Sequence, residues 1–397
     1  MRTSSIKLLF LIAALLAGTL GCTQSVAERP GRKIDDLLAA RQADDLAQAK
    51  TGQEVVQKLM KRVEAKAAAA PAGTRPTIDF LVISGGGDWG AFGAGVLKGW
   101  GKVQGEMARP QFDVVSGVST GAMIAPFAFL GDDASIERIV HMYRNPQKDW
   151  AESRGMLFFW PSNPSFYALP GLEREMRNAM DRPTVERIAK EDGTGRLLAV
   201  NTTNVDFGDM HPWDIIAECK VALAKNDMDH VHRILMASAG IPGVFPAQGI
   251  DGSLYVDGAI TGNILYGARA KDDATLAALW KAKHPNQQMP RIRYWIIFNN
   301  QLRFPPQVTQ PRWPDIMNRA MIMATQTSTI SSMRHLYAQQ EINEIKYGAD
   351  VEVRLMAVPD SWVPPSPGVF KNDVMNNLAD LGEKMGADPA SWRTTPP

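Results

Sequence analysis

The fold is decided by residues 78–121, which read IDFLVISGGGDWGAFGAGVLKGWGKVQGEMARPQFDVVSGVSTG. Residues 78–84 are rich in β-branched and aromatic side chains and end in glycines, and residues 112–116 form a second run of this kind. Residues 91–103, between them, can form a helix. The order of strand, glycine turn, helix and strand predicts a βαβ unit with two parallel strands.

The same alternation continues along the chain. Further strand-like runs cover residues 196–203, 254–257, 293–300 and 350–357, and helical segments separate them. Residues 314–347 read as one or two amphipathic helices, whose methionine-rich face we expect to lie in the core rather than on lipid. The pattern predicts an α/β fold.

Composition excludes several classes of protein. The 397 residues are 45% hydrophobic and 21% charged, which is typical of a globular chain with a buried core. The formal net charge of +1 provides no strong field for a phosphate-rich polymer, so we expect no nucleic-acid partner. Two cysteines cannot build a disulfide framework, and no Cys/His cluster predicts a zinc site. We expect neither a metal nor another cofactor.

The N-terminus predicts export. Arg2 and Lys7 come before the apolar run 8–17, which is too short to span a bilayer core but suits a signal peptide. The residues before Cys22 resemble the lipobox of bacterial lipoproteins, although Thr19 stands where that motif usually has leucine. The resemblance implies that residues 1–21 are removed and that Cys22 carries a lipid anchor in the bacterial cell envelope, on the periplasmic or surface side. Ordinary cleavage or an uncleaved interfacial segment are the alternatives.

Residues 22–76 read as the anchor, a helical spacer and a linker. Residues 35–66 have apolar positions at roughly helical spacing, which favours a helix packed on the domain by one face over a partner-binding coiled coil. Two prolines and no apolar period in residues 67–76 mark the linker. The main domain then covers residues 77–358. We expect residues 359–397 to form a loosely packed extension with one short helix near 372–385.

The first candidate site is the glycine loop at residues 85–90 (GGGDWG), which follows a strand and opens a helix. Backbone N–H groups at a helix N-terminus favour negative charge. The loop also matches the dinucleotide fingerprint GxGxxG. However, Asp113 begins the second strand and does not end it, which argues against a Rossmann site.

The second candidate site is the GVSTG sequence at residues 117–121. G-x-S-x-G between a strand and a helix is the pattern of a nucleophile elbow, so Ser119 is the candidate nucleophile and a tight structural turn is the alternative. A serine nucleophile needs a base. None of the six histidines has a distinctive context, whereas Asp257 ends a short strand-like run just before Gly258. Asp257 is the better candidate, although many Asp-Gly pairs only support their own turn.

In this order the motifs resemble the patatin-like phospholipase family. The resemblance rests on the glycine loop 85–90, the elbow 117–121, the block ASAGIPGVFP at 237–246 and the DGA turn at 257–259. It covers about residues 77–300 and implies a three-layer α/β/α fold with a mostly parallel sheet. It further implies a catalytic dyad of Ser119 and Asp257 without histidine, an oxyanion hole at Gly85, Gly86 and Gly87, and hydrolysis of a lipid or acyl ester.

One departure from the family limits the substrate. Trp89 stands where the family commonly has Arg or Lys, so acyl-ester hydrolysis is better supported than a preference for phospholipid headgroups. Trp89 and Thr120 are candidate residues of the substrate pocket, with Trp89 lining an acyl channel. Residues 156–161 (MLFFWP) are expected either to form an exposed apolar loop that contacts lipid or gates the site, or to lie in the core.

Two other functions remain open. A conventional serine hydrolase would use a distant histidine, His335 or His211, as its base. A lipoprotein without catalytic activity would bind lipid or a protein partner on the same fold. The sequence does not define an oligomeric state.

Overall fold

The computed structural model describes residues 29, 31–71, 73–155, 163–267 and 275–397. The predicted signal peptide 1–21, the predicted anchor Cys22 and the apolar segment 156–161 lie outside these residues. Within them, no helix is both long enough and apolar enough to cross a membrane.

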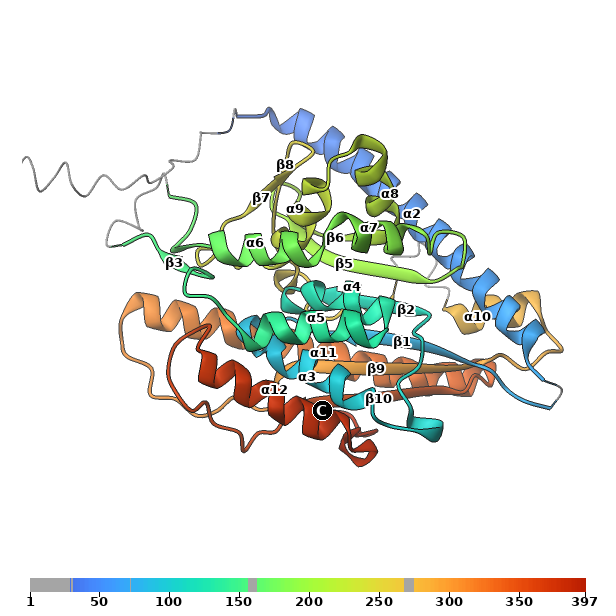
Figure 1. Ribbon diagram of the computed structural model, residues 1–397. Coiled ribbons are helices and arrows are strands. Elements are labelled where there is room, and N and C mark those ends of the chain that lie inside the picture. The colour runs from blue at the N-terminus through green and yellow to red at the C-terminus, as the bar shows by residue number, and fades with distance from the viewer. Residues whose placement is uncertain (1–28, 30, 72, 156–162, 268–274) are drawn as a thin grey trace, which may run out of the picture.

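An eight-stranded sheet forms the centre of the domain (Figure 1), with the order β10-β9-β1-β2-β5-β8-β7 and with β6 paired to β5. The strands from β10 to β5 are parallel to one another, whereas β6 and β8 run antiparallel to β5. The strands are β1 (Thr77–Ile83), β2 (Val114–Val118), β5 (Leu197–Asn204), β6 (Asp209–Asp214), β7 (Gln248–Ile250), β8 (Ser253–Asp257), β9 (Arg291–Gln301) and β10 (Val351–Val358), and a separate pair is formed by β3 (Glu152–Ser153) and β4 (Tyr167–Ala168).

Helices cover both faces of the sheet, which makes three layers (Figure 1). One face packs on α3 (Gly90–Trp100), α4 (Thr120–Leu130), α5 (Asp133–Arg144) and α12 (Asn372–Gly386), and the other on α2 (Ile34–Ala69), α10 (Leu276–Lys283) and α11 (Trp313–Tyr347). The remaining helices, α6 (Pro170–Ala179), α7 (Arg182–Ala189), α8 (Ile215–Lys225) and α9 (Asp229–Ser238), lie around the antiparallel part. The predicted α/β/α fold with a mostly parallel sheet is confirmed.

Two expectations about packing were wrong. The C-terminal extension is not loosely packed, because α12 buries Leu378 and its neighbours against α3. The two helices are so close that a Cβ on Gly95 would lie 2.2 Å from the carbonyl oxygen of Ala379. The methionines early in α11 are not in the core either, since Met317 is 59% exposed and Met323 is 45% exposed.

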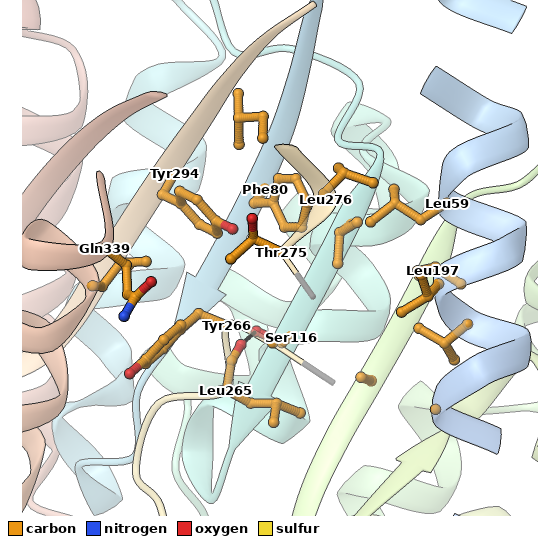
Figure 2. Close-up of a pocket in the computed structure, with 18 of the residues that line it drawn as sticks. Leu59, Phe80, Ser116, Leu197, Leu265, Tyr266, Thr275, Leu276, Tyr294 and Gln339 are labelled. Atoms are coloured by element: carbon orange, nitrogen blue, oxygen red, sulfur yellow. Dashed lines mark hydrogen bonds between the residues drawn. The ribbon is translucent and has the colours of Figure 1, made fainter. Parts of the chain in front are cut away.

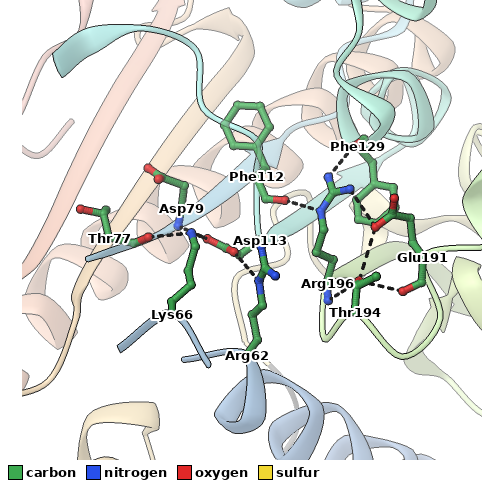
Figure 3. A network of polar contacts seen from close by, with 10 residues as sticks. All are labelled: Arg62, Lys66, Thr77, Asp79, Phe112, Asp113, Phe129, Glu191, Thr194 and Arg196. Carbon is green, nitrogen blue, oxygen red and sulfur yellow. Dashed lines mark hydrogen bonds and ion pairs between the residues drawn. The ribbon is translucent and has the colours of Figure 1, made fainter. Parts of the chain in front are cut away.

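Helix α2 packs on the domain by one face, as predicted, and a buried carboxylate fixes it there (Figure 3). The side chain of Asp113 is fully buried. It accepts hydrogen bonds from Arg62 Nε at 2.9 Å and from Lys66 Nζ at 2.6 Å, both on α2, and from the backbone N–H of Asp79 at 2.9 Å. One carboxylate therefore joins α2 to the beginning of β1.

We expect Asp113→Asn to lower the free energy of unfolding by about 3 kcal/mol, because breaking a buried ion pair leaves its partners uncompensated. Denaturant unfolding measures the change. The control is Asp133→Asn, since the Asp133 side chain pairs with Arg109 but is 97% exposed, and an exposed pair contributes about 1 kcal/mol or less. Equal losses in both variants would contradict a special role for Asp113.

Candidate active site

Ser119 lies in a sharp turn between β2 and α4. Its backbone has φ 56° and ψ −123°, a conformation that residues with a side chain rarely adopt. The turn depends on close approaches of the backbone: a Cβ on Gly117 would lie 2.2 Å from the carbonyl oxygen of Gly121, and one on Gly121 would lie 2.3 Å from that of Ile83. The strand, turn and helix have the arrangement of a nucleophile elbow.

The structure brings Asp257 to Ser119. Asp257 is the last residue of β8, and its backbone N–H donates to the carbonyl oxygen of Gly240. Ser119 Oγ donates to Asp257 Oδ2 at 2.7 Å, and the backbone N–H of Ala259 donates to Oδ1 at 2.8 Å. Both predicted residues are buried, Ser119 with 4% exposure and Asp257 with 2%.

Burial also changes the chemistry of this carboxyl group. Loss of hydration disfavours the charged form and raises the pKa of Asp257 to about 7, although the hydrogen bonds from Ala259 and Ser119 act in the opposite direction. A carboxylate with this pKa is a stronger base than an exposed aspartate. It is half ionised near neutral pH, the condition in which a general base works best.

Ser238 supports the elbow, and sequence reasoning did not identify its role. Its hydroxyl accepts a hydrogen bond from the backbone N–H of Ser119 at 2.8 Å and donates to the carbonyl oxygen of Asn201 at 2.6 Å. The Asn201 side chain in turn donates to the carbonyl oxygen of Gly258 at 3.0 Å. Ser238 and Asn201 thus connect the turns that carry Ser119 and Asp257. The only sequence signal was that Ser238 belongs to the block 237–246.

The glycine loop lies directly beside Ser119. A Cβ on Gly85 would lie 2.9 Å from Ser119 Cβ. The N–H of Gly85 donates to Asn263 Oδ1 at 2.8 Å, so in this structure it is not free for an oxyanion, unlike the prediction. For the N–H groups of Gly86 and Gly87, no acceptor is found among the residues that the structure describes. Two of the three predicted donors are therefore available.

Thr120, which was predicted to line the substrate pocket, begins α4, and its side chain contacts α5. It is 3% exposed, and its hydroxyl forms a hydrogen bond with the hydroxyl of Tyr143 on α5. The Tyr143 hydroxyl also lies 3.3 Å from the carbonyl oxygen of Thr120. The side chain thus connects α4 to α5.

Trp89 is half-buried and packs against the C-terminal segment. Its ring meets that of Trp362 edge to face, with 4.8 Å between the ring centroids. The same segment is fixed to the glycine loop by Phe370, whose backbone N–H donates to Asp88 Oδ2 at 2.9 Å. Residues 362–370, which sequence reasoning placed outside the main domain, therefore cover the outer side of the glycine loop.

The two histidines considered as alternative bases lie elsewhere. His211 contacts Gln48 and Asp44 of α2, and His335 is exposed on α11. Within the described part of the chain, no histidine hydrogen-bonds to Ser119. In the same residues there is also no group of three or more His, Cys, Asp or Glu side chains placed to hold a metal ion.

A cavity of about 640 Å³ lies on the other face of the sheet, beneath α2, α10 and α11 (Figure 2). Phe80, Ser116, Leu197 and Tyr294 line it from the sheet. Neither Ser119 nor Asp257 belongs to its described lining, so this cavity is separate from the candidate dyad.

The comparison with protein families agrees with the motifs. Residues 81–268 match the family model of patatin-like phospholipases, and this region contains the glycine loop, Ser119 and Asp257. No curated protein matches the chain. A similar solved structure is VipD from Legionella pneumophila, at 11% identity and a TM-score of 0.34, over 82% of this chain and 68% of that one. Residues 81–268 are therefore similar to the domain that defines the patatin-like phospholipases.

Proposed function

We propose that this protein is a lipid acyl hydrolase, of the phospholipase A, lysophospholipase or carboxylesterase type, with Ser119 as nucleophile and Asp257 as base. The observation that carries the proposal is the 2.7 Å hydrogen bond between the elbow hydroxyl and a buried carboxyl group. The family match supports the reaction class, because a patatin-like phospholipase domain implies lipid acyl hydrolysis.

In the first half of the reaction, Asp257 accepts the proton of Ser119 while Oγ attacks the ester carbonyl carbon. The bond to the leaving alcohol breaks, and this alcohol takes the proton from Asp257. In the second half, water gives a proton to Asp257 and attacks the acyl-serine ester. The acid is released as Ser119 recovers the proton.

The carbonyl oxygen gains negative charge in both tetrahedral intermediates. The N–H groups of Gly86 and Gly87, which have no acceptor among the described residues, are the donors we assign to this oxyanion. One such donor lowers the barrier by about 2.7–4 kcal/mol in comparable sites. The N-terminus of α4, at Ser119, adds a favourable dipole for the developing charge.

Labelling with a fluorophosphonate tests the proposal, since this probe reacts with activated serines. We expect the chain from residue 23 onward to be labelled on the peptide that contains Ser119, as mass spectrometry would show. Ser116→Ala is the matched control, because Ser116 is a buried serine on β2, the strand that leads into the Ser119 turn, and this variant should be labelled like the wild type.

Labelling at another serine would contradict the assignment of Ser119. A folded protein that is not labelled at all would favour the function without catalysis, in which the fold binds lipid or a protein partner.

A further inference from the structure

The first part of α11 exposes apolar side chains along one face. Trp313 is 70% exposed, Met317 59%, Ile316 52% and Met323 45%. Together with Ala320 they recur at intervals of three and four residues, which places them on one side of a helix. We call these five residues the α11 stripe.

The α11 stripe belongs to the first turns of the helix, which extend into solvent. A helix turns by about 100° per residue, which puts Ile322 and Met333 on the side opposite to Trp313. Ile322 is 41% exposed, so the first turns of α11 are exposed on both sides. Gln326 and Met333 are buried. Arg319 packs over the ring of Phe304 at 5.0 Å and donates to the carbonyl oxygen of Pro305 at 3.0 Å. The helix is therefore held by buried side chains from Gln326 onward, while its first turns, which carry the stripe, meet solvent.

The charges around the stripe are mostly positive. Residues 302–325 contain Arg303, Arg312 and Arg319 and one acidic residue, Asp315, which pairs with Arg312 at 3.6 Å. One further carboxylate, Asp360, accepts from the backbone N–H of Arg303 at 3.0 Å. Basic residues beside an apolar face that carries tryptophan are typical of helices that lie in the interface of an anionic membrane. Tryptophan suits this position because one end of its side chain is apolar and the other is polar.

The stripe also lies at the carboxyl end of the parallel strands, which is the end of the sheet that carries Ser119. We call this end the Ser119 edge. Gln326 Nε2 donates to the carbonyl oxygen of Gln301, the last residue of β9, at 2.6 Å. Two residues earlier in β9, Asn299 contacts the glycine loop, since a Cβ on Gly86 would lie 2.2 Å from its carbonyl oxygen. From Gln326 the first turns of α11 project beyond the end of β9 (Figure 1).

Two more features share this edge. Ile260, three residues after Asp257, is 45% exposed. Arg29 forms an ion pair with Asp206 at 2.8 Å, in the turn that follows the carboxyl end of β5. Cys22, the predicted lipid anchor, comes seven residues before Arg29. Because β9, β1 and β2 are parallel, a membrane that meets the stripe would lie at the same end of the sheet as the turn that carries Ser119.

We propose that the α11 stripe docks on an anionic lipid membrane, with its apolar side chains among the acyl chains and the neighbouring arginines at the headgroups. The docked protein presents the Ser119 edge of the sheet to the lipid. The purpose of this docking rests on the proposed hydrolase function, but the binding itself does not.

Flotation with lipid vesicles tests the docking. The Ser119→Ala chain from residue 23 is used, so that neither hydrolysis nor a lipid anchor contributes, with vesicles of phosphatidylcholine with and without phosphatidylglycerol. We expect binding to the anionic vesicles that weakens with added salt. The double variant Ile316→Asn/Met317→Asn replaces two half-exposed apolar side chains. It should weaken the binding to anionic vesicles by about tenfold or more.

Ile345→Asn is the matched control, because Ile345 is an 84% exposed isoleucine at the other end of the same helix. It should bind as the parent does. No binding to anionic vesicles, or equal binding by the stripe variant, would overturn the proposal. The proposal would also be overturned if the parent is a dimer in light scattering and the only change in the stripe variant is that it becomes a monomer. That result would assign the stripe to contact with a second copy of this chain.

Hydrolysis of a soluble ester separates the two proposals. It is measured on the same stripe and control variants, made in the chain that keeps Ser119. We expect Ile316→Asn/Met317→Asn to retain the wild-type rate on this substrate. If the wild type is inactive but still binds vesicles through the stripe, the hydrolase proposal fails and the docking proposal stands.

Discussion

Replacing Ser119 with alanine is expected to lower kcat/KM for a soluble ester by about 10⁵-fold or more, which is the scale seen when a serine hydrolase loses its nucleophile. The reason is that the hydroxyl bonded to Asp257 forms the covalent intermediate, and Asp257 without it has no alcohol to activate. Steady-state hydrolysis of a p-nitrophenyl ester measures the loss. A Ser119→Ala chain that keeps a tenth of the activity would exclude Ser119 as nucleophile.

Ser119→Gly shows that the loss is not due to unfolding. Alanine must adopt the same φ of 56° as serine, whereas glycine reaches positive φ without strain. Strain of this kind amounts to about 1–3 kcal/mol, which exceeds the loss of about 0.4–1 kcal/mol from the greater flexibility of glycine in the unfolded chain. We therefore expect the glycine variant to be inactive yet more stable than the alanine variant, as thermal unfolding would show.

Those parts of the site that depend on local sequence could be predicted. The elbow needs a strand, small residues and a helix in direct succession, and residues 112–125 contain all of these. Asp257 could be found because it ends an apolar run before a glycine. The distance between Ser119 and Asp257 could not be derived from either motif, and only the family resemblance suggested it.

The contacts that organise the site come from distant parts of the chain, which sequence patterns do not show. Asn263 occupies the N–H of Gly85, and Ser238 bonds to the N–H of Ser119. The strands β6 and β7 were also missed, because β6 contains Pro212 and begins and ends with aspartate, while β7 has only three residues. Their place in the sheet is set by pairing with β5 and β8.

Apolar periodicity likewise did not show which apolar helix face packs against another part of the protein. Helix α12 and the first part of α11 are both amphipathic, yet α12 packs on α3 through glycines that allow close approach, whereas the α11 stripe meets solvent. The methionines of α11 therefore read as core residues in the sequence. Their exposure became visible only when the partner-facing side of the helix was known.

Asp257→Asn is expected to lower kcat/KM by about 10³-fold, within the range of about 10²–10⁴ for removal of a general base. Asparagine keeps the size of the side chain and can still accept the hydrogen bond from Ala259, but it cannot take the proton of Ser119. The variants His335→Ala and His211→Ala are the controls and should remain active. Substantial activity in Asp257→Asn together with its loss in a histidine variant would move the base to that histidine.

The pH dependence gives a second measure of the same residue. Because burial raises the pKa of Asp257 to about 7, wild-type kcat/KM for an uncharged ester should rise tenfold per pH unit below this value and level off above it. Asp257→Asn should not show this step. A wild-type profile that is flat between pH 5 and pH 8, taken here as about two units below and one above the expected pKa, would contradict a buried carboxylate base.

The same pKa shift predicts the sign of a stability change. The folded protein binds the proton of Asp257 more tightly than the unfolded chain, in which the pKa is about 3.9. The wild type should therefore lose stability as pH rises from this value through about 7, because the folded state must then bury the charge. Asp257→Asn lacks this cost, so its stability relative to the wild type should increase between acid and neutral pH. Denaturant unfolding of both proteins across this range measures the difference, and the opposite trend would mean that Asp257 is stabilised as a carboxylate and is a weaker base than the mechanism requires.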